Sequence, residues 1–510
     1  MKPLSTFCKS IIVSSALWAA VPAVAASEMT TVTIEPDTVS TLRNPLTGWV
    51  MYLGRTWDAD FWTTNGYDSM VTSTGDTVRV SDYASCAYIR TSWASFEPEE
   101  GKYAWNDPDS RLMRLIRSVW DRGMRIAFRV VIDGRDQAQN TPQYVFDAGA
   151  EGYYDPKNPG KNYSPYPDDP VFQEKYTKFF HAMAREFDDP DKVEFIDAYS
   201  LGKWGESHSM IYKDNANKEP VFEWVVSLAT SCFKRVPMLV HYHRMLGDPT
   251  YDGWGAVPEN AARLISKAVD LGFSLRHDAF GMTGYYQEWE KEQAKKWNFT
   301  RPIIMEGGWI TGAHHRYWID PSGEYRQGHA IDVREGEYRA SREAHVNMMD
   351  FRINDETRSW FQEAFPLVKK FIAEGGYRLY PDMISIPLSA SRGQKVSITH
   401  RWNNLGWGYC PTNIPQWNQR YKVGFALLDS STLEPVKVWA DKNTRLDLWL
   451  KGSPTEYTTY ITIDGVPAGK YVWAVGLVDV TRGNEIGLKI AARNNVTTLG
   501  WVKLSDVILK

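Results

Sequence analysis

The feature that most constrains the fold is a regular alternation of short apolar runs with amphipathic stretches between about residues 45 and 375. Each apolar run has the length of one buried strand, and the stretches between them carry apolar residues at helical spacing. Eight strands that alternate with helices predict a (β/α)8 barrel, also called a TIM barrel. The predicted strands are Gly48–Leu53, Ala87–Ser92, Ile126–Ile132, Phe195–Leu201, Met238–Tyr242, Ser274–Ala279, Pro302–Met305 and His345–Phe351.

Helical patterns between these runs support the barrel. The segment DSRLMRLIRSVWDRG ends at Gly123 with Arg122 in its last turn, and ETRSWFQEAFPLVKKFIAEGG closes the region with Gly375 as a C-cap. A doubly wound open sheet is the competing fold. Such a sheet often carries a Gly-rich phosphate loop after its first strand, and this sequence has none there. The barrel is therefore favoured.

The pattern changes at about Tyr377. From there on, short runs with period-two alternation, such as QKVSITHRW and KYVWAVGLVD, are separated by Gly, Pro, Asn and Asp. This pattern predicts a C-terminal antiparallel β-sandwich. The segment TTVTIEPD (30–37) predicts a further strand that packs on one of the two domains. We therefore divide the chain into a signal peptide (1–25), an N-terminal strand segment (26–44), a barrel (45–376) and a sandwich (377–510).

The N-terminal residues have the three parts of a cleavable signal peptide. Lys2 and Lys9 supply the charge, IIVSSALWAAV the apolar core, and Ala23-Val24-Ala25 the cleavage site. No later segment is long and apolar enough to predict a membrane span. The sequence thus predicts a secreted or periplasmic protein.

Composition narrows the choice of partner. The net charge is −4 and there are no basic runs, which argues against nucleic acid as a partner. The chain contains 22 Trp and 27 Tyr, and the faces of such rings pack well on sugars. A carbohydrate partner is therefore favoured, although many of these rings must belong to the core.

Polar and aromatic side chains cluster where the predicted strands end. Reactive groups of a (β/α)8 barrel sit at the C-terminal ends of its strands. For several of these residues a structural role is an equal alternative: core packing for the tryptophans, and a local salt bridge for Asp133 with Arg135. The candidate substrate-binding residues are Arg90, Trp93, Asp133, Arg135, Trp204, His241, His243, Asp278, Tyr285 and Trp309.

Two glutamates stand apart from this set. Glu206, in SLGKWGESH, follows the fourth strand, and Glu306, in PIIMEGGW, follows the seventh. Strands four and seven lie roughly opposite each other across a barrel. Glycoside hydrolysis needs two carboxyl groups, about 5–5.5 Å apart for retention of configuration and about 6.5–9.5 Å apart for inversion. The pair therefore predicts a glycoside hydrolase.

This placement resembles clan A glycoside hydrolases, and the segment YIRTSWASFEPEEGKYAW (88–105) is similar to the strand-two signature of that clan. The resemblance implies that Glu206 is the acid/base and Glu306 the nucleophile of a retaining enzyme. The substrate would be an oligo- or polysaccharide with a β-linkage, and no metal or other cofactor is needed. The sandwich, with NPLTGW (44–49), resembles exported bacterial barrel proteins with a C-terminal domain of unknown function.

One position departs from the clan. The clan usually has Asn directly before the acid/base residue, whereas this chain has Gly205. This departure favours an alternative function, a non-catalytic glycan-binding protein on a degenerate barrel. A metal-dependent hydrolase that uses His241, His243 and Asp278 and a structural envelope protein are further alternatives.

A retaining enzyme also needs different environments for its two acids. We expect Trp204 to favour the protonated form of Glu206. Arg90, Arg135 or a histidine would keep Glu306 ionised.

Overall fold

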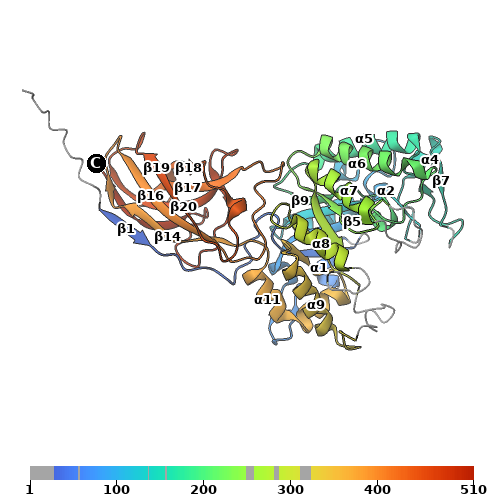
Figure 1. Ribbon diagram of the computed structural model, residues 1–510, viewed down its shortest axis with the longest axis horizontal. Coiled ribbons are helices and arrows are strands. Elements are labelled where there is room, and N and C mark those ends of the chain that lie inside the picture. Colours follow the sequence, from blue (N-terminus) through green and yellow to red (C-terminus); the bar gives the residue numbers. More distant parts are fainter. Residues whose placement is uncertain are drawn as a thin grey trace, which may run out of the picture.

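The computed structural model describes residues 28–54, 58–135, 137–155, 158–247, 258–278, 280, 286–309 and 323–510. The predicted signal peptide lies outside these residues. Eight parallel strands close into a barrel, as predicted, and helices surround it (Figure 1). The barrel strands are β2 (Gly48–Leu53), β5 (Ala84–Ser92), β6 (Arg125–Val131), β9 (Val193–Asp197), β10 (Met238–His241), β11 (Ser274–Asp278), β12 (Ile303–Glu306) and β13 (Met348–Asp350).

The fourth strand differs most from its prediction at its C-terminal end. It was expected over Phe195–Leu201, whereas β9 ends at Asp197. Ser200 has a φ of 52° and Gly202 a φ of 83°, values that an extended strand does not adopt. The apolar residues after Asp197 are therefore buried in a compact loop.

The helices follow the predicted pattern, with two additions and one break. The sequence prediction lacked α6 and α9, and it treated α10 and α11 as one helix. Pro366 has no N–H group and would disrupt the interior of a continuous helix. It lies instead in the first turn of α11, where a missing N–H group is tolerated, so one helix ends and a second begins at this point. The principal helices are α3 (Arg111–Trp120), α5 (Pro170–Phe187), α6 (Lys218–Cys232), α7 (Pro258–Asp270), α8 (Glu288–Trp297), α9 (Ala330–Glu343), α10 (Asp355–Gln362) and α11 (Phe365–Glu374).

Shorter elements lie in the segments that connect the first four barrel strands. They comprise three one-turn helices and two small hairpins, together with several 3-10 turns. No helix in the described part of the chain is both long and apolar enough to cross a membrane. The short elements are α1 (Phe61–Thr64), α2 (Trp93–Phe96), α4 (Gln143–Asp147), β3 (Met70–Val71), β4 (Thr77–Val78), β7 (Gly152–Tyr153) and β8 (Ser164–Pro165).

The C-terminal part forms two sheets, which agrees with the predicted sandwich. One sheet has the order β1-β14-β16-β19, and the other β15-β22-β20-β17-β18 with β21 beside β20. Every pairing is antiparallel except that of β15 with β22. The N-terminal strand β1 therefore belongs to the sandwich. The strands are β1 (Met29–Val32), β14 (Leu379–Pro387), β15 (Ser389–Ala390), β16 (Lys395–Asn404), β17 (Tyr421–Asp429), β18 (Pro435–Asp441), β19 (Thr455–Thr462), β20 (Gly469–Asp479), β21 (Glu485–Leu488) and β22 (Val502–Leu509).

The sandwich lies against the N-terminal end of the barrel (Figure 1). The side-chain amide of Asn347, just before β13, donates to the carbonyl oxygens of Leu46 and Tyr409 at 2.9 and 2.8 Å. The indole of Trp407 donates to Val346 O at 2.8 Å and packs on the ring of Phe371. These contacts leave the C-terminal ends of the strands on the opposite side of the barrel from the sandwich.

Candidate active site

Glu206 and Glu306 come together at the C-terminal end of the barrel on one shared guanidinium group. Arg129 Nη1 lies 3.2 Å from Glu206 Oε1, and its Nη2 lies 2.6 Å from Glu306 Oε2. The two nitrogens of a guanidinium are about 2.3 Å apart, so these two carboxylate oxygens are at most about 8 Å apart. Two acids that are 100 positions apart in the chain thus share one site.

The loop that carries Glu206 has an unusual backbone. Ser200, Trp204, Ser207 and Ser209 all have φ values between 51° and 65°. Each such residue costs of order 1 kcal/mol or more, and residues of this kind concentrate at functional sites. Backbone hydrogen bonds within the loop, such as Ser207 N to Leu201 O at 2.9 Å, hold this conformation. The loop fixes the direction in which Glu206 points.

Glycines beside both glutamates make room for arginines. A Cβ atom on Gly205 would lie 2.8 Å from Cδ of Arg129, and one on Gly307 would lie 2.8 Å from Cγ of Arg352. Gly205 also has a φ of 73°. The departure from Asn at this position therefore has a steric cause, because Arg129 occupies the space that a side chain would need.

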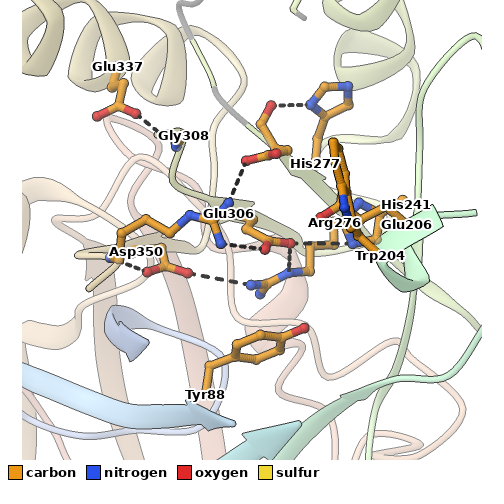
Figure 2. A network of polar contacts seen from close by, with 12 residues as sticks. Tyr88, Trp204, Glu206, His241, Arg276, His277, Glu306, Gly308, Glu337 and Asp350 are labelled. Carbon is orange, nitrogen blue, oxygen red and sulfur yellow. Dashed lines mark hydrogen bonds and ion pairs between the residues drawn. The ribbon is translucent and has the colours of Figure 1, made fainter. Parts of the chain in front are cut away.

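A further layer of charge lies under the two glutamates. Asp197, the last residue of β9, accepts from the hydroxyl of Tyr88 at 2.6 Å and contacts Arg129 Nη2 at 2.9 Å. Arg276 Nε lies 3.3 Å from both Asp197 Oδ2 and Glu306 Oε2, and its guanidinium stacks on the ring of Tyr88. Figure 2 shows Glu306 at the centre of this network, with Tyr88 beside Arg276.

Arg352 links Glu306 to two more acids. Its Nη1 lies 2.8 Å from Glu306 Oε1, and its Nη2 lies 3.5 Å from Asp278 Oδ1. Its backbone N–H donates to Asp350 Oδ1 at 2.6 Å. Asp350 Oδ2 in turn lies 3.4 Å from Nη2 of Arg276. The network therefore reaches from the end of β9 to the loop after β13.

These surroundings divide the acids into two groups. Burial raises the pKa of Glu206, but contact with His208 and the charges of Arg129 and Arg90 outweigh it and lower the pKa to about 2. Burial likewise opposes ionisation of Glu306, and three arginines hold its pKa well below the usual range. Glu206 is therefore ionised in this state, and the expectation that Trp204 would keep it protonated was wrong.

Asp278 and Asp350 behave in the opposite way. Burial raises the pKa of Asp350 to about 7, although Arg276 and Arg352 oppose the shift. Burial also raises the pKa of Asp278 well above its usual range; Arg352 opposes this shift, and the negative charge of Glu306 adds to it. The site thus holds both ionised and neutral carboxyl groups.

The proposed metal set of His241, His243 and Asp278 does not assemble. His243 Nε2 donates to Glu206 O at 2.7 Å and its Nδ1 accepts from Met245 N, so both ring nitrogens are engaged. His243 instead supports the backbone of Glu206. A different trio, Asp197, His241 and Glu306, has ligand atoms within 4.8 Å of one another.

Arg129 already supplies a cation to that trio. Its Nη2 lies 2.5 Å from His241 Nε2, and the same nitrogen contacts the carboxylates of Asp197 and Glu306. Burial and the charge of Arg129 lower the pKa of His241. The ring is therefore a neutral acceptor that helps to orient the guanidinium.

Three predicted residues border the site on the β5 and β6 side. Arg90 is half-buried, pairs in register with Arg129, and donates to Gln137 Oε1 at 3.0 Å. Arg135 and Asp133 form a buried ion pair of 2.6 Å, and Arg135 also donates to Ser209 O. These contacts match the structural alternative for Asp133 with Arg135, which together support the loop of Glu206.

The predicted tryptophans divide between core and surface. Trp93 was expected to contact substrate, but it is fully buried among aromatic rings and donates to Glu97 Oε2 at 2.8 Å. The structure therefore matches the core-packing alternative for Trp93, because the chain turns into α2 there and packs the indole against α5. Trp309 is 43% exposed and Trp204 is half-buried, so both rings reach the surface near the glutamates. Tyr285 lies outside the described residues.

Several residues that build the site were missed. Arg129, Arg276 and Asp350 lie inside predicted strands, where a charged side chain is rare unless it is paired. For Arg129 and Asp350 the available signal was a charged residue between two apolar neighbours, whereas Arg276 is followed by His277 and had no such signal. Asp197 was missed because the predicted strand ran past it. Arg352 follows β13 and had no local signal.

Fold and site together define a (β/α)8 barrel with a C-terminal β-sandwich and a buried cluster of acids and arginines at the C-terminal end of the barrel. No family model and no curated protein matches the sequence. Three of the solved structures that resemble it are the catalytic domain of β-amylase from Paenibacillus polymyxa, endo-glycoceramidase II from Rhodococcus sp. and xylanase 10B from Thermotoga maritima.

The similarity to these three structures is remote. The β-amylase domain has a TM-score of 0.41 at 10% identity, over 65% of this chain and 99% of that one. The endo-glycoceramidase has a TM-score of 0.36 at 12% identity, over 85% and 100% of the two chains. The xylanase has a TM-score of 0.35 at 8% identity, over 60% and 83%. At these values the similarity assigns no activity, and the functional argument rests on the site.

Proposed function

We propose that the protein hydrolyses O-glycosidic bonds of an oligo- or polysaccharide. The observation that carries the proposal is the convergence of Glu206 and Glu306 on the guanidinium of Arg129. Two carboxyl groups at this separation are what glycoside hydrolysis requires. Because residues 1–25 predict a signal peptide, the proposed substrate is extracellular or periplasmic.

Glu306 has the properties of a nucleophile. It is ionised at neutral pH, and the described residues give its Oε1 a single hydrogen bond, from Arg352. A carboxylate oxygen has two lone pairs, so one remains to attack the anomeric carbon. In the retaining mechanism that we propose, Glu306 forms a glycosyl ester and Glu206 is its carboxyl partner. Carboxylate attack and proton transfer suffice for this chemistry, so the proposal includes no cofactor.

The upper limit of about 8 Å on the separation of the carboxylate oxygens is compatible with retention and with inversion. The configuration of the first-formed product distinguishes the two outcomes. We expect proton NMR of a reaction in progress to show the anomer of the substrate before mutarotation. The opposite anomer would support inversion, with Glu206 activating a water molecule.

The proposal is tested with a panel of aryl glycosides and β-linked oligosaccharides. We expect the protein to cleave at least one of them and Glu306→Gln to lower kcat by 10³-fold or more, since the nucleophile is lost. Glu194→Gln is the matched control, because Glu194 is also buried against an arginine but lies at the opposite end of the barrel. The control should lose stability and keep its kcat.

A glycan-binding protein without catalysis is the second candidate, and one observation favours it. The guanidinium of Arg129 contacts both carboxylates, and the side chain of Glu306 has no exposed surface. An arginine that contacts both acids can hold the fold together without any catalytic role for the acids. Calorimetric binding of an oligosaccharide that the protein never cleaves, with affinity lost in Trp309→Ala, would favour this candidate.

A further inference from the structure

The acids at the C-terminal end of the barrel outnumber the buried arginines that serve them. Each of five carboxyl groups lies within 3.5 Å of at least one guanidinium nitrogen, but among the described residues only three guanidinium groups make these contacts. Unpaired negative charge is costly in a buried site, so this excess favours the protonated form of some of the acids. The carboxyl groups belong to Asp197, Glu206, Asp278, Glu306 and Asp350, and the guanidinium groups to Arg129, Arg276 and Arg352.

Asp278 and Asp350 are the two acids whose protonated form burial favours. Their pKa values are raised by burial, whereas those of the other three acids are lowered. Asp278 is faced by Arg352, Glu306, Glu206 and Arg129. Its neighbour His277 donates from Nδ1 to the backbone oxygen of Asp278. Burial also lowers the pKa of His277 to about 3, so this ring adds no positive charge.

Only one of the two neutral acids can reach a substrate. The side chain of Asp350 has no exposed surface, whereas that of Asp278 is 17% exposed, compared with 7% for Glu206. Asp278 Oδ1 has no hydrogen-bond partner among the described residues. Asp278 thus combines a side chain that is partly open to solvent with a buried Oδ1, whose contact with Arg352 at 3.5 Å is too long for a hydrogen bond.

The position of Asp278 relative to Glu306 suits two acids that act on one bond. The two residues pair in register on β11 and β12. Arg352 contacts Glu306 Oε1 at 2.8 Å and Asp278 Oδ1 at 3.5 Å, so these oxygens are at most about 9 Å apart. The exposed ring of Trp309 covers the same guanidinium at 5.2 Å. A sugar packed on Trp309 would thus lie beside both acids.

We propose that Asp278, and not Glu206, donates the proton to the glycosidic oxygen, while Glu206 stays ionised beside the anomeric carbon. This assignment rests on the proposed hydrolase function. It also explains how the site could supply a proton although Glu206, the acid expected from its position in the chain, is ionised. Asp278 is then a catalytic residue in addition to a substrate contact.

The proposed step balances in protons and electrons. The bond between the anomeric carbon and the glycosidic oxygen breaks, and its electron pair stays on that oxygen, which takes the proton of Asp278 and leaves as an alcohol. A lone pair of Glu306 forms the ester bond to the anomeric carbon. The new carboxylate of Asp278 faces Arg352. In the second half, a water oxygen bonds to the anomeric carbon and gives a proton to Asp278, while the ester bond breaks and its electron pair returns to the carboxylate of Glu306.

The test compares two leaving groups on the sugar that the wild-type protein cleaves fastest. A dinitrophenyl group leaves without protonation, whereas an alkyl or unsubstituted phenyl group needs a proton donor. We expect Asp278→Asn to slow the poor leaving group by 10²–10⁴-fold and the dinitrophenyl group by less than about tenfold at the bond-breaking step. Glu206→Gln should slow both substrates to a similar extent.

Asp350→Asn is the matched control, because it removes a neutral buried acid that has no access to substrate. It should leave the ratio of the two rates unchanged. An infrared difference spectrum of wild type minus Asp278→Asn at pH 7 should show the C=O stretch of a protonated carboxyl group, independently of turnover.

The outcomes separate the two proposals. A leaving-group effect in Glu206→Gln but not in Asp278→Asn, or a difference spectrum without the carboxyl band, would overturn the role of Asp278 and leave the hydrolase function intact. Cleavage of no substrate in the panel would overturn both. The combination of the carboxyl band with the leaving-group effect in Asp278→Asn alone would establish the assignment.

Discussion

The two ends of the barrel treat buried charge in different ways. At the N-terminal end, Glu194 takes one donor on each oxygen, Arg125 Nε on one and the backbone N–H of Leu46 on the other. At the C-terminal end, the single guanidinium of Arg129 contacts three acids, Asp197, Glu206 and Glu306. An exclusive pair neutralises itself, whereas a shared cation leaves an excess of acid. The first end thus holds a self-contained ion pair, whereas the second concentrates charge where a (β/α)8 barrel carries its reactive groups.

Removal of the shared cation is the strongest way to break this comparison. Arg129→Met leaves three buried acids without their common partner, and we expect the free energy of unfolding to fall by roughly 3–5 kcal/mol or more. Arg125→Met, the control, deprives a single acid and should cost less. Urea unfolding at pH 7 measures both. If the two variants lost the same free energy of unfolding, an arginine shared by three acids would contribute no more to stability than one paired with a single acid.

The position of the site, but not its charge network, could be predicted from the sequence. Glu206 and Glu306 were found because strand ends on a barrel meet at one edge, and hydrophobic periodicity locates strand ends to within a few residues. Asp197 shows the limit of this approach. It lies in an apolar run that continues past the real end of β9, and periodicity has no means of detecting the turn at Ser200.

The arginines needed information that periodicity does not contain. Arg129 shares a strand face with Arg125, yet the first points into a cluster of acids and the second forms one pair at the other end of the barrel. The choice depends on which acids other strands bring nearby. The same holds for Gly205, whose lack of a side chain became intelligible only once Arg129 was found beside it.

The excess of acid also predicts an unusual pH dependence of stability. The pKa of Asp350 is about 7 in the folded protein and about 4 in an unfolded chain. Between these values the folded state holds a proton that the unfolded state has released, so the free energy of unfolding falls as pH rises. The contribution is at most about 4 kcal/mol.

Asp350→Asn removes this titration. The variant should match wild type near pH 3, below both pKa values, where Asp350 is protonated in both states, and should exceed it in stability at pH 8. Thermal unfolding at both pH values measures the effect. A variant that is less stable than wild type at pH 8 would mean that ionised Asp350 is stabilised by Arg276, and the count of neutral acids would then be wrong.

A smaller effect tests the fit of Arg129 against the loop of Glu206. In Gly205→Ala the new Cβ would lie 2.8 Å from Cδ of Arg129, and the backbone has a φ of 73°. Gly101→Ala is the matched control, since Gly101 has a φ of 77° and nothing within 4 Å of the new atom. Both variants carry the backbone cost of about 1 kcal/mol. Gly205→Ala should lose a further 1–3 kcal/mol, roughly, through overpacking, together with activity.

The smallest effect concerns an exposed charge contact between the sandwich and the barrel. Arg482 bonds both oxygens of Asp191 at 2.7 and 2.8 Å, but the two side chains are 37% and 61% exposed. A pair in such contact with water contributes at most about 1 kcal/mol. We expect a double-mutant cycle of Arg482→Ala and Asp191→Ala to give a coupling below this value that disappears near 1 M salt, where the Debye length is about 3 Å. A larger coupling that persists in salt would mean that this exposed ion pair contributes substantially to the stability of the junction. The N-terminal end of the barrel would then also depend on charges outside its buried pair, and the two ends would differ less.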